Sequence, residues 1–83
     1  MAKVTLTRDA VKGLEGLPLV IHARVLSLLE RLARWPTVSG AKPLSGALAG
    51  HYRLRTGDYR VQFRVQGRAV VVEKIGHRDR FYE

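Results

Sequence analysis

Arginine recurs at alternate positions in two neighbouring stretches of this sequence. The first stretch is YRLRT, residues 52–56, and the second is YRVQFRV, residues 59–65. Side chains at alternate positions of a β-strand point to the same face of the sheet. We therefore expect one face to carry the side chains of Arg53, Arg55, Arg60, Gln62 and Arg64.

Guanidinium groups gathered on one surface suit a phosphate-rich partner. Each presents a fork of N–H donors that matches phosphate oxygens, and it stays charged at any working pH. Several together would grip an RNA backbone and neutralise negative charge that develops on a phosphorus centre. The alternative is an ordinary solvated sheet face, the usual role of alternating charges on a strand. Repulsion among the arginines, with Asp58 as the one intervening acid, weighs against that alternative.

The C-terminal segment GHRDRFYE, residues 76–83, adds further candidates. Arg78 and Arg80 can reach the rim of the same face, and Phe81 and Tyr82 supply rings on which bases could stack. His77 titrates near neutral pH, which suits proton transfer, and a surface histidine in a turn is the plain alternative.

The charge balance of the whole chain also indicates a polyanionic partner. Fifteen Lys and Arg against seven Asp and Glu give a net charge of +8 in 83 residues, which we expect to form one domain, residues 1–83. A merely basic surface is the alternative. The absence of cysteine suits a reducing cytosol, and no apolar run is long enough for a signal peptide or a membrane span. We expect a cytoplasmic protein without membrane contact.

Metal and cofactor chemistry is not predicted. His22 and His51 have no partner at a ligand-like spacing, so we expect both to be structural or exposed. The sequence contains no cysteine nucleophile, phosphate loop or dinucleotide-binding motif.

Two helices precede the arginine-rich stretches. Thr7 stands where an N-cap would begin a short first helix, which Gly16 can end. Pro18 then opens a longer second helix, whose apolar stripe at gaps of three and four residues continues to Trp35. Pro36 stops this helix.

Alternation predicts a strand before the helices and three strands after them. Residues 3–6 form the first strand, and residues 36–51 read as a connecting loop. Residues 52–56, 59–65 and 69–75 follow as a meander, and the unbroken apolar start of the last stretch is typical of a central strand. We therefore predict an α+β fold of order β-α-α-β-β-β, with a two-helix hairpin on one face of a mostly antiparallel four-stranded sheet.

The run HYRLRTGDYRVQFRV, followed by VVVEKIGHRDRFY, is similar to the C-terminal half of RelE-type toxins of the RelE/ParE superfamily. The segment KPLSGALAG resembles the Lys-x-Leu-x-Gly loop of that family, and with the paired helices the resemblance covers nearly the whole chain. It implies an mRNA endoribonuclease that depends on the ribosome and acts in the A site. In that reaction a 2′-hydroxyl attacks the neighbouring phosphate, and no metal takes part.

The resemblance also implies roles for single residues. Arg60 and Arg78 would stabilise the charged transition state, Arg53 and Arg55 would hold the RNA backbone, and Tyr82 would stack on or orient a base. The complete expected set is Arg55, Arg60, His77, Arg78 and Tyr82 for catalysis, and Arg53, Arg55, Arg64, Arg80 and Phe81 for RNA binding.

One departure from the family affects proton transfer. Some members carry lysines where this chain has Arg53 and Arg55, and those lysines can help to move protons. Arginine effectively does not give up its proton. We therefore expect His77 or Tyr82 to transfer protons.

Two other functions stay open at this point. A ParE-like toxin that inhibits DNA gyrase by binding would have the same fold, and a nucleic-acid-binding module would bind in a salt-dependent way without cleavage. Both toxin functions imply a small antitoxin protein whose acidic segment covers the basic face. We expect a monomer when the chain is free and a hetero-oligomer with the antitoxin, with mRNA and the ribosome as further partners.

Overall fold

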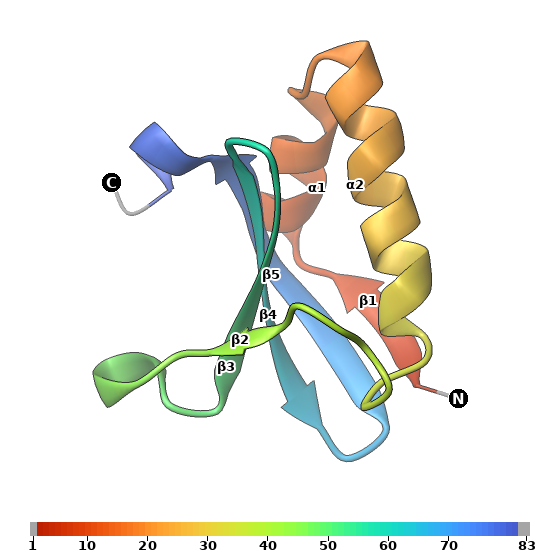
Figure 1. Ribbon diagram of the computed structural model, residues 1–83, viewed down its shortest axis with the longest axis vertical. Coiled ribbons are helices and arrows are strands. Elements are labelled where there is room, and N and C mark those ends of the chain that lie inside the picture. Colours follow the sequence, from red (N-terminus) through yellow and green to blue (C-terminus); the bar gives the residue numbers. More distant parts are fainter. Residues whose placement is uncertain (1, 82–83) are drawn as a thin grey trace.

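The computed structural model describes residues 2–81 and shows two helices packed on one side of a twisted sheet (Figure 1). The elements are β1 (Lys3–Leu6), α1 (Arg8–Glu15), α2 (Leu19–Leu32), β2 (Lys42–Pro43), β3 (His51–Thr56), β4 (Tyr59–Gln66) and β5 (Ala69–His77). Single turns of 3₁₀-helix lie at Gly46–Leu48 and Arg78–Arg80. The predicted α+β fold with its helical hairpin is confirmed.

The sheet has five strands within the described residues, in the order β1-β5-β4-β3-β2. β1 runs parallel to β5, and the other neighbouring pairs are antiparallel. The sequence predicted four strands. The additional strand, β2, has two residues and is too short to show an alternating pattern. β5 lies between β1 and β4, as its unbroken apolar start predicted.

α1 begins and ends where its capping residues predict. Thr7 Oγ1 accepts a hydrogen bond from the Ala10 backbone N–H at 3.2 Å, and Gly16 is the C-cap. Gly13 has a low helix propensity but a clear structural role, since a Cβ atom at this position would lie 2.0 Å from the Ile75 carbonyl oxygen. Glycine therefore lets α1 rest directly on the backbone of β5.

α2 ends at Leu32, before the predicted apolar stripe ends at Trp35. The Trp35 ring lies beyond the helix and meets the rings of Tyr52 and Phe63 edge-on, with centroid distances of 4.7 Å and 5.4 Å. The stripe correctly predicted that Trp35 packs on the core. It overestimated the helix because an apolar side chain in the following turn can reach the same core.

Both helices cover the same face of the sheet, and the core lies between these two layers (Figure 1). The buried core residues are Ala10, Val25, Leu28, Leu29 and Leu32 from the helices, and Leu54, Val61, Phe63, Val70, Val72 and Ile75 from the strands. Because side chains alternate along a strand, the intervening arginines of β3 and β4 point to the other face. No helix in the described part of the chain is long and apolar enough to cross a bilayer.

Candidate functional site

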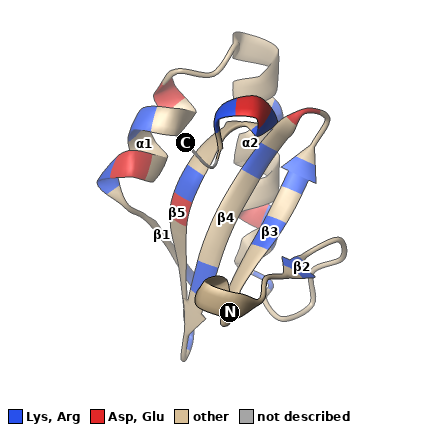
Figure 2. Cartoon of the chain, turned by 90° about the vertical axis from the view of Figure 1, so that its left-hand side faces the viewer, with Lys and Arg blue, Asp and Glu red and all other residues tan. Residues whose placement is uncertain are grey.

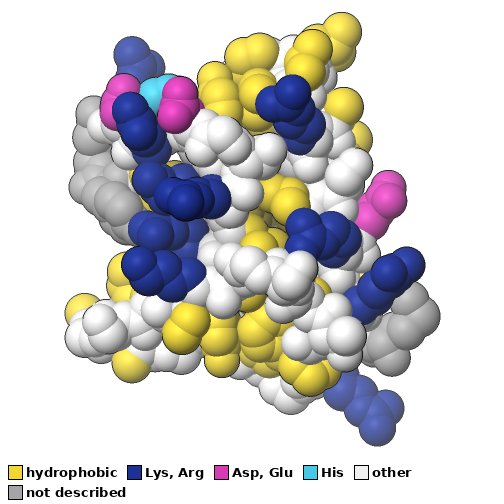
Figure 3. All heavy atoms as spheres, viewed as in Figure 1, with side chains coloured by type: hydrophobic (Ala, Val, Ile, Leu, Met, Phe, Trp, Pro, Cys, Tyr) yellow, Lys and Arg dark blue, Asp and Glu magenta, His cyan; other side chains and the backbone are white. Residues whose placement is uncertain are grey.

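The face of the sheet opposite the helices carries four of the nine predicted site residues, Arg53, Arg55, Arg60 and Arg64. Figure 2 looks onto this face and shows basic residues on three adjacent strands, β3, β4 and β5. In the space-filling view, Lys and Arg side chains gather on the left of the molecule, with acidic side chains beside them at the upper end (Figure 3). We use the name open face for the surface formed by His51, Arg53, Arg55, Arg60, Gln62, Arg64, Glu73 and Lys74.

Two arginines lie directly opposite each other at one end of the open face. The strand register pairs Arg55 on β3 with Arg60 on β4. Like charges in this position destabilise a strand pair. Arg60 Nη1 is also buried without a hydrogen-bond acceptor among the described residues, and such an atom costs about 1–3 kcal/mol. Both features oppose stability, and both would be relieved by an anion such as a phosphate.

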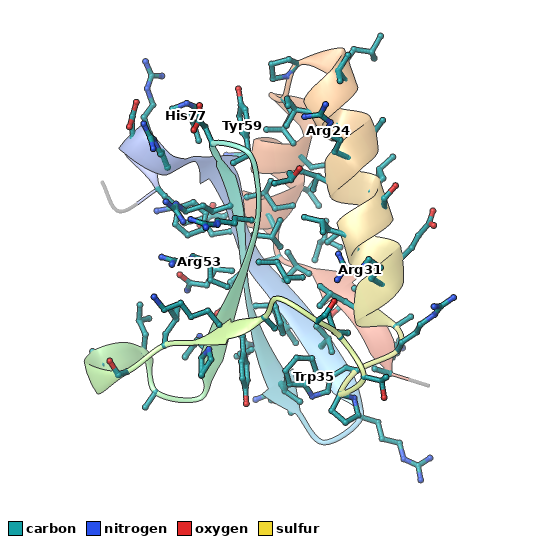
Figure 4. The ribbon with its side chains drawn as sticks, in the orientation of Figure 1. Arg24, Arg31, Trp35, Arg53, Tyr59 and His77 are labelled. Carbon is teal, nitrogen blue, oxygen red and sulfur yellow. The ribbon has the colours of Figure 1, made fainter. Side chains whose placement is uncertain are left out.

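The neighbouring cations extend this basic region to the sheet edge. Lys42 on β2 lies opposite Arg53 on β3. Together with Gly40 and Arg55 they line a hollow of about 210 Å³. Figure 4 shows Arg53 pointing away from the helices. The structure therefore brings Arg53, Arg55 and Arg60 together, as the alternation predicted, and adds Lys42, which the sequence analysis did not select.

A β-bulge in β5 changes the predicted alternation. Gln62 pairs with Lys74, whereas Phe63 pairs with Val72, so Glu73 is an extra residue on β5. After the bulge Ile75 faces the core and Lys74 faces the other way. Strict alternation from Val72 would have buried Lys74 and exposed Ile75. A charged residue at a position that alternation buries, followed by an apolar residue at a position that it exposes, was the signal in the sequence for the bulge. Because this signal was not used, the sequence analysis did not select Lys74.

Glu73 is the centre of a hydrogen-bonded cluster on the open face. Its Oε1 lies 2.5 Å from His51 Nδ1, its Oε2 accepts from Arg64 Nη1 at 3.0 Å, and Gln62 Nε2 donates to Oε1 at 3.4 Å. Burial raises the pKa of the Glu73 carboxyl, but the hydrogen bonds from His51, Arg64 and Gln62 outweigh burial and hold the pKa below its ordinary value of 4.5. Glu73 is therefore a carboxylate at neutral pH.

This cluster changes the interpretation of Arg64 and gives His51 a partner. Arg64, expected to bind RNA, has its charge paired with Glu73. His51, expected to be structural or exposed, is half-buried and bound to the same carboxylate. The sequence analysis did not select Glu73, because the contact between residues 51 and 73 depends on how the strands align.

Arg78 is held by two carboxylates at the end of β5. Its Nη1 lies 3.8 Å from Asp58 Oδ1 and its Nε lies 3.5 Å from Asp79 Oδ1, while its backbone N–H donates to the Asp58 carbonyl at 2.8 Å. The side chain remains more than half exposed. A phosphate that binds Arg78 would therefore compete with these two exposed acids.

His77 is the last residue of β5 rather than part of the tail. Its Nδ1 lies 3.1 Å from the Asp79 backbone nitrogen and 3.5 Å from Asp79 Oδ2. Its ring meets Tyr59 edge-on at 5.1 Å, and Figure 4 shows the two residues side by side at the upper end of the sheet. Both also line a cleft of about 590 Å³ between α1 and the C-terminal turn. Asp79 thus fixes the orientation of the His77 imidazole.

Phe81 does not offer its ring to a base in this structure. The residue is 1% exposed, and the Lys74 Nζ atom lies 5.0 Å from the ring centroid. A Cβ atom on Gly76 would lie 3.9 Å from Phe81 Cδ1, so the ring covers the backbone of β5 at that glycine. The expectation of base stacking on Phe81 is wrong here, because the ring anchors the C-terminal turn. Arg80 in that turn is exposed, and Tyr82 lies outside the described residues.

Residues 2–81 bring together no group of three His, Cys, Asp or Glu side chains that could hold a metal ion. The open face is instead a surface of guanidinium and ammonium groups around one carboxylate cluster.

Comparison with known proteins identifies the family. Residues 4–82 match the family described as the ParE toxin of the type II toxin–antitoxin system parDE. The chain belongs to the RelE/ParE superfamily of toxins. This toxin is 26% identical to Toxin RelE3 of Methanocaldococcus jannaschii over 84 aligned positions, which cover 98% of this chain and 96% of that protein.

Solved structures agree with this assignment. A chain of the toxin–antitoxin complex RelBE2 from Mycobacterium tuberculosis is 34% identical to the toxin, with a TM-score of 0.81 over 93% of this chain and 98% of that chain. The isolated RelE toxin of E. coli shares the fold at 16% identity, with a TM-score of 0.77 over 93% of this chain and 84% of that chain. The expected superfamily is thereby confirmed. The match carries the ParE name and these relatives carry the RelE name, so the comparisons establish a type II toxin but not its target.

Proposed function

We propose that this toxin is a metal-independent endoribonuclease that cuts mRNA in the ribosomal A site and so inhibits translation. The observation that supports this most strongly is the end of the open face where Arg55 opposes Arg60 and the Arg60 Nη1 atom lacks an acceptor among the described residues. The repulsion between the two arginines and the unpaired N–H group destabilise the free protein. A bound phosphate would relieve both, because it supplies negative charge and acceptor oxygens.

The proposed reaction is attack by a 2′-hydroxyl on the adjacent phosphate, which leaves a 2′,3′-cyclic phosphate and a free 5′-hydroxyl. Arg60 would stabilise the negative charge on the non-bridging phosphate oxygens. Arg78 would leave its contacts with Asp58 and Asp79 and bind the same phosphate. Arg53 would hold the RNA backbone on the neighbouring strand.

His77 would accept the proton of the 2′-hydroxyl. In the structure His77 Nδ1 accepts from the Asp79 backbone N–H, so the neutral imidazole carries its proton on Nε2. For Nε2 to take the 2′-hydroxyl proton, the ring proton would first move to Nδ1, which would exchange the Asp79 N–H for Asp79 Oδ2, 3.5 Å away. Tyr82, which follows the described residues, remains the second proposed proton-transfer group, with base stacking as its other proposed role.

An acidic antitoxin is the proposed partner of the free toxin. The relative of known structure from M. tuberculosis is part of a toxin–antitoxin complex. The present chain has a net charge of +8 and a basic open face, so an acidic segment would be attracted to the surface that binds RNA. Occupation by antitoxin and by RNA would be mutually exclusive. The proposed complex forms in the cytoplasm, where the ribosomal target lies.

A second candidate is inhibition of DNA gyrase by binding, because the matching family description is that of the ParE toxin. That function would not require proton transfer at His77. Primer extension on mRNA incubated with ribosomes and the purified toxin separates the two candidates. New 3′ ends within the A-site codon are expected for the endoribonuclease. Intact mRNA together with inhibited DNA supercoiling would overturn the endoribonuclease in favour of gyrase inhibition.

A further inference from the structure

The proposed reaction needs a proton for its leaving 5′-oxygen, because an unprotonated alkoxide is a poor leaving group. His77 takes the proton of the attacking 2′-hydroxyl and does not hold a second one. The guanidinium groups of Arg53, Arg55 and Arg60 do not release their protons at a working pH. Tyr82 lies outside the described residues, so the proton donor that the structure can place is another side chain near Arg60.

Lys74 is placed close to Arg60 by the bulge in β5. Gly76, two positions further along β5, is the register partner of Arg60. The Lys74 Nζ atom lies 5.0 Å from the centroid of the Phe81 ring, which itself rests over Gly76. The ammonium group is therefore directed along β5 toward the Gly76–Arg60 pair and toward the turn that begins at Arg78.

The contact with Phe81 fixes where the Lys74 ammonium lies. Phe81 is 1% exposed, and a buried aromatic ring attracts the cation to its face. None of the salt bridges between described residues involves Lys74. A phosphate ester can thus approach its free side without displacing an acid.

The other titratable groups on this surface are placed differently. His51 pairs with Arg64, which lies four positions from Arg60 along β4, or about 13 Å at roughly 3.3 Å per residue. Its Nδ1 is also bound to Glu73. Lys42 lies on the opposite edge of the sheet, on β2. Neither residue is positioned to act on a phosphate that Arg60 holds.

We propose that Lys74 is the general acid of the reaction, an inference that rests on the proposed endoribonuclease function. The 2′-oxygen forms a bond to phosphorus while His77 Nε2 takes its proton. The bond between phosphorus and the 5′-oxygen breaks, and the 5′-oxygen takes a proton from Lys74 Nζ. His77 then releases its proton to water and Lys74 regains one, so the protein returns to its starting state.

The substitution Lys74→Arg tests this role directly. Arginine keeps the positive charge and can stay over the Phe81 ring, but it does not donate a proton. The single-turnover rate of cleavage on ribosome-bound mRNA is expected to fall about 100-fold or more, with little change in the toxin concentration that gives half-maximal rate. Lys3→Arg, on an exposed side chain of β1, is the matched control and is expected to cleave normally.

An mRNA with sulfur in place of the scissile 5′-oxygen separates proton donation from RNA binding. A thiolate leaves without being protonated, so the general acid is not needed on this substrate. Lys74→Arg is expected to cut it nearly as fast as the unaltered toxin does. Equal impairment of Lys74→Arg on the oxygen and sulfur substrates, or normal cleavage of both, would overturn the proposal.

The two proposals can fail separately in this experiment. If the unaltered toxin does not cut ribosome-bound mRNA, the endoribonuclease function fails, and the assignment of Lys74 fails with it. If the unaltered toxin cuts and Lys74→Arg cuts equally well, only the assignment of Lys74 fails. Equal thermal unfolding midpoints for the unaltered toxin and Lys74→Arg would show that any loss of rate is not a loss of fold.

Discussion

Glu73 Oε2 accepts a hydrogen bond from Arg64 Nη1 at 3.0 Å on the open face of the sheet. This ion pair separates the basic residues into two groups. Arg64 is neutralised and, with His51, forms a cluster around the carboxylate. Arg55 and Arg60 form an uncompensated pair toward the other end of the same strands. The proposed reaction is therefore expected at the Arg60 end, and the Glu73 cluster is expected to stabilise the fold.

Arg60→Ala is expected to lower cleavage of ribosome-bound mRNA about 100-fold to 1000-fold, the usual loss when a group that stabilises transition-state charge is removed. Stability should be unchanged or slightly higher, because the substitution removes a like charge opposite Arg55 and a buried atom without an acceptor. Primer extension and urea unfolding measure the two effects. Arg24→Ala on α2, far from the open face, is the control (Figure 4). Full toxicity of Arg60→Ala would contradict the assigned site.

His77→Gln is expected to slow cleavage about 100-fold, because glutamine cannot take up the proton of the 2′-hydroxyl. Single-turnover rates on ribosome-bound mRNA test this expectation. An unchanged rate would show that His77 only caps the C-terminal turn, where its Nδ1 accepts from the Asp79 backbone.

Glu73→Gln is expected to lower the free energy of unfolding at neutral pH. The variant should also lose less of this free energy than the unaltered toxin does when the pH falls. The folded-state pKa of Glu73 lies below the ordinary 4.5, so its contribution is present above pH 4.5 and is lost as the pH falls through the folded-state pKa. Urea unfolding from pH 7 to pH 3 measures this dependence. Glu30→Gln on the exposed side of α2 is the control. An acid limb identical to that of the unaltered toxin would remove Glu73 as its source.

Gly13→Ala is expected to destabilise the toxin by about 1–3 kcal/mol or more, although alanine favours helices. The added Cβ would lie 2.0 Å from the Ile75 carbonyl oxygen, so α1 would have to move away from β5. Gly16→Ala is the matched control, because its Cβ would meet the Lys12 carbonyl oxygen at an ordinary 3.5 Å. Thermal unfolding compares the two variants, and equal midpoints would show that α1 does not rest on β5 in this way.

The sequence by itself determined the two helices, every strand of the described sheet except β2, and which face of the sheet is basic. Thr7 and Gly16 cap the two ends of α1. The alternation around Leu54 and Val61 assigns the neighbouring arginines to the face away from the core. These inferences succeed because helix caps and strand alternation depend on residues that are close together in the chain.

Only the tertiary structure decided which of these side chains are available for chemistry. Arg64 is neutralised by Glu73, and Phe81 is buried over Gly76. Lys74 reaches the open face because β5 bulges at Glu73. The physical reason is that contacts between strands depend on their register. A single extra residue in β5 reverses the direction of the side chains after it. Strict alternation along the sequence does not predict that reversal.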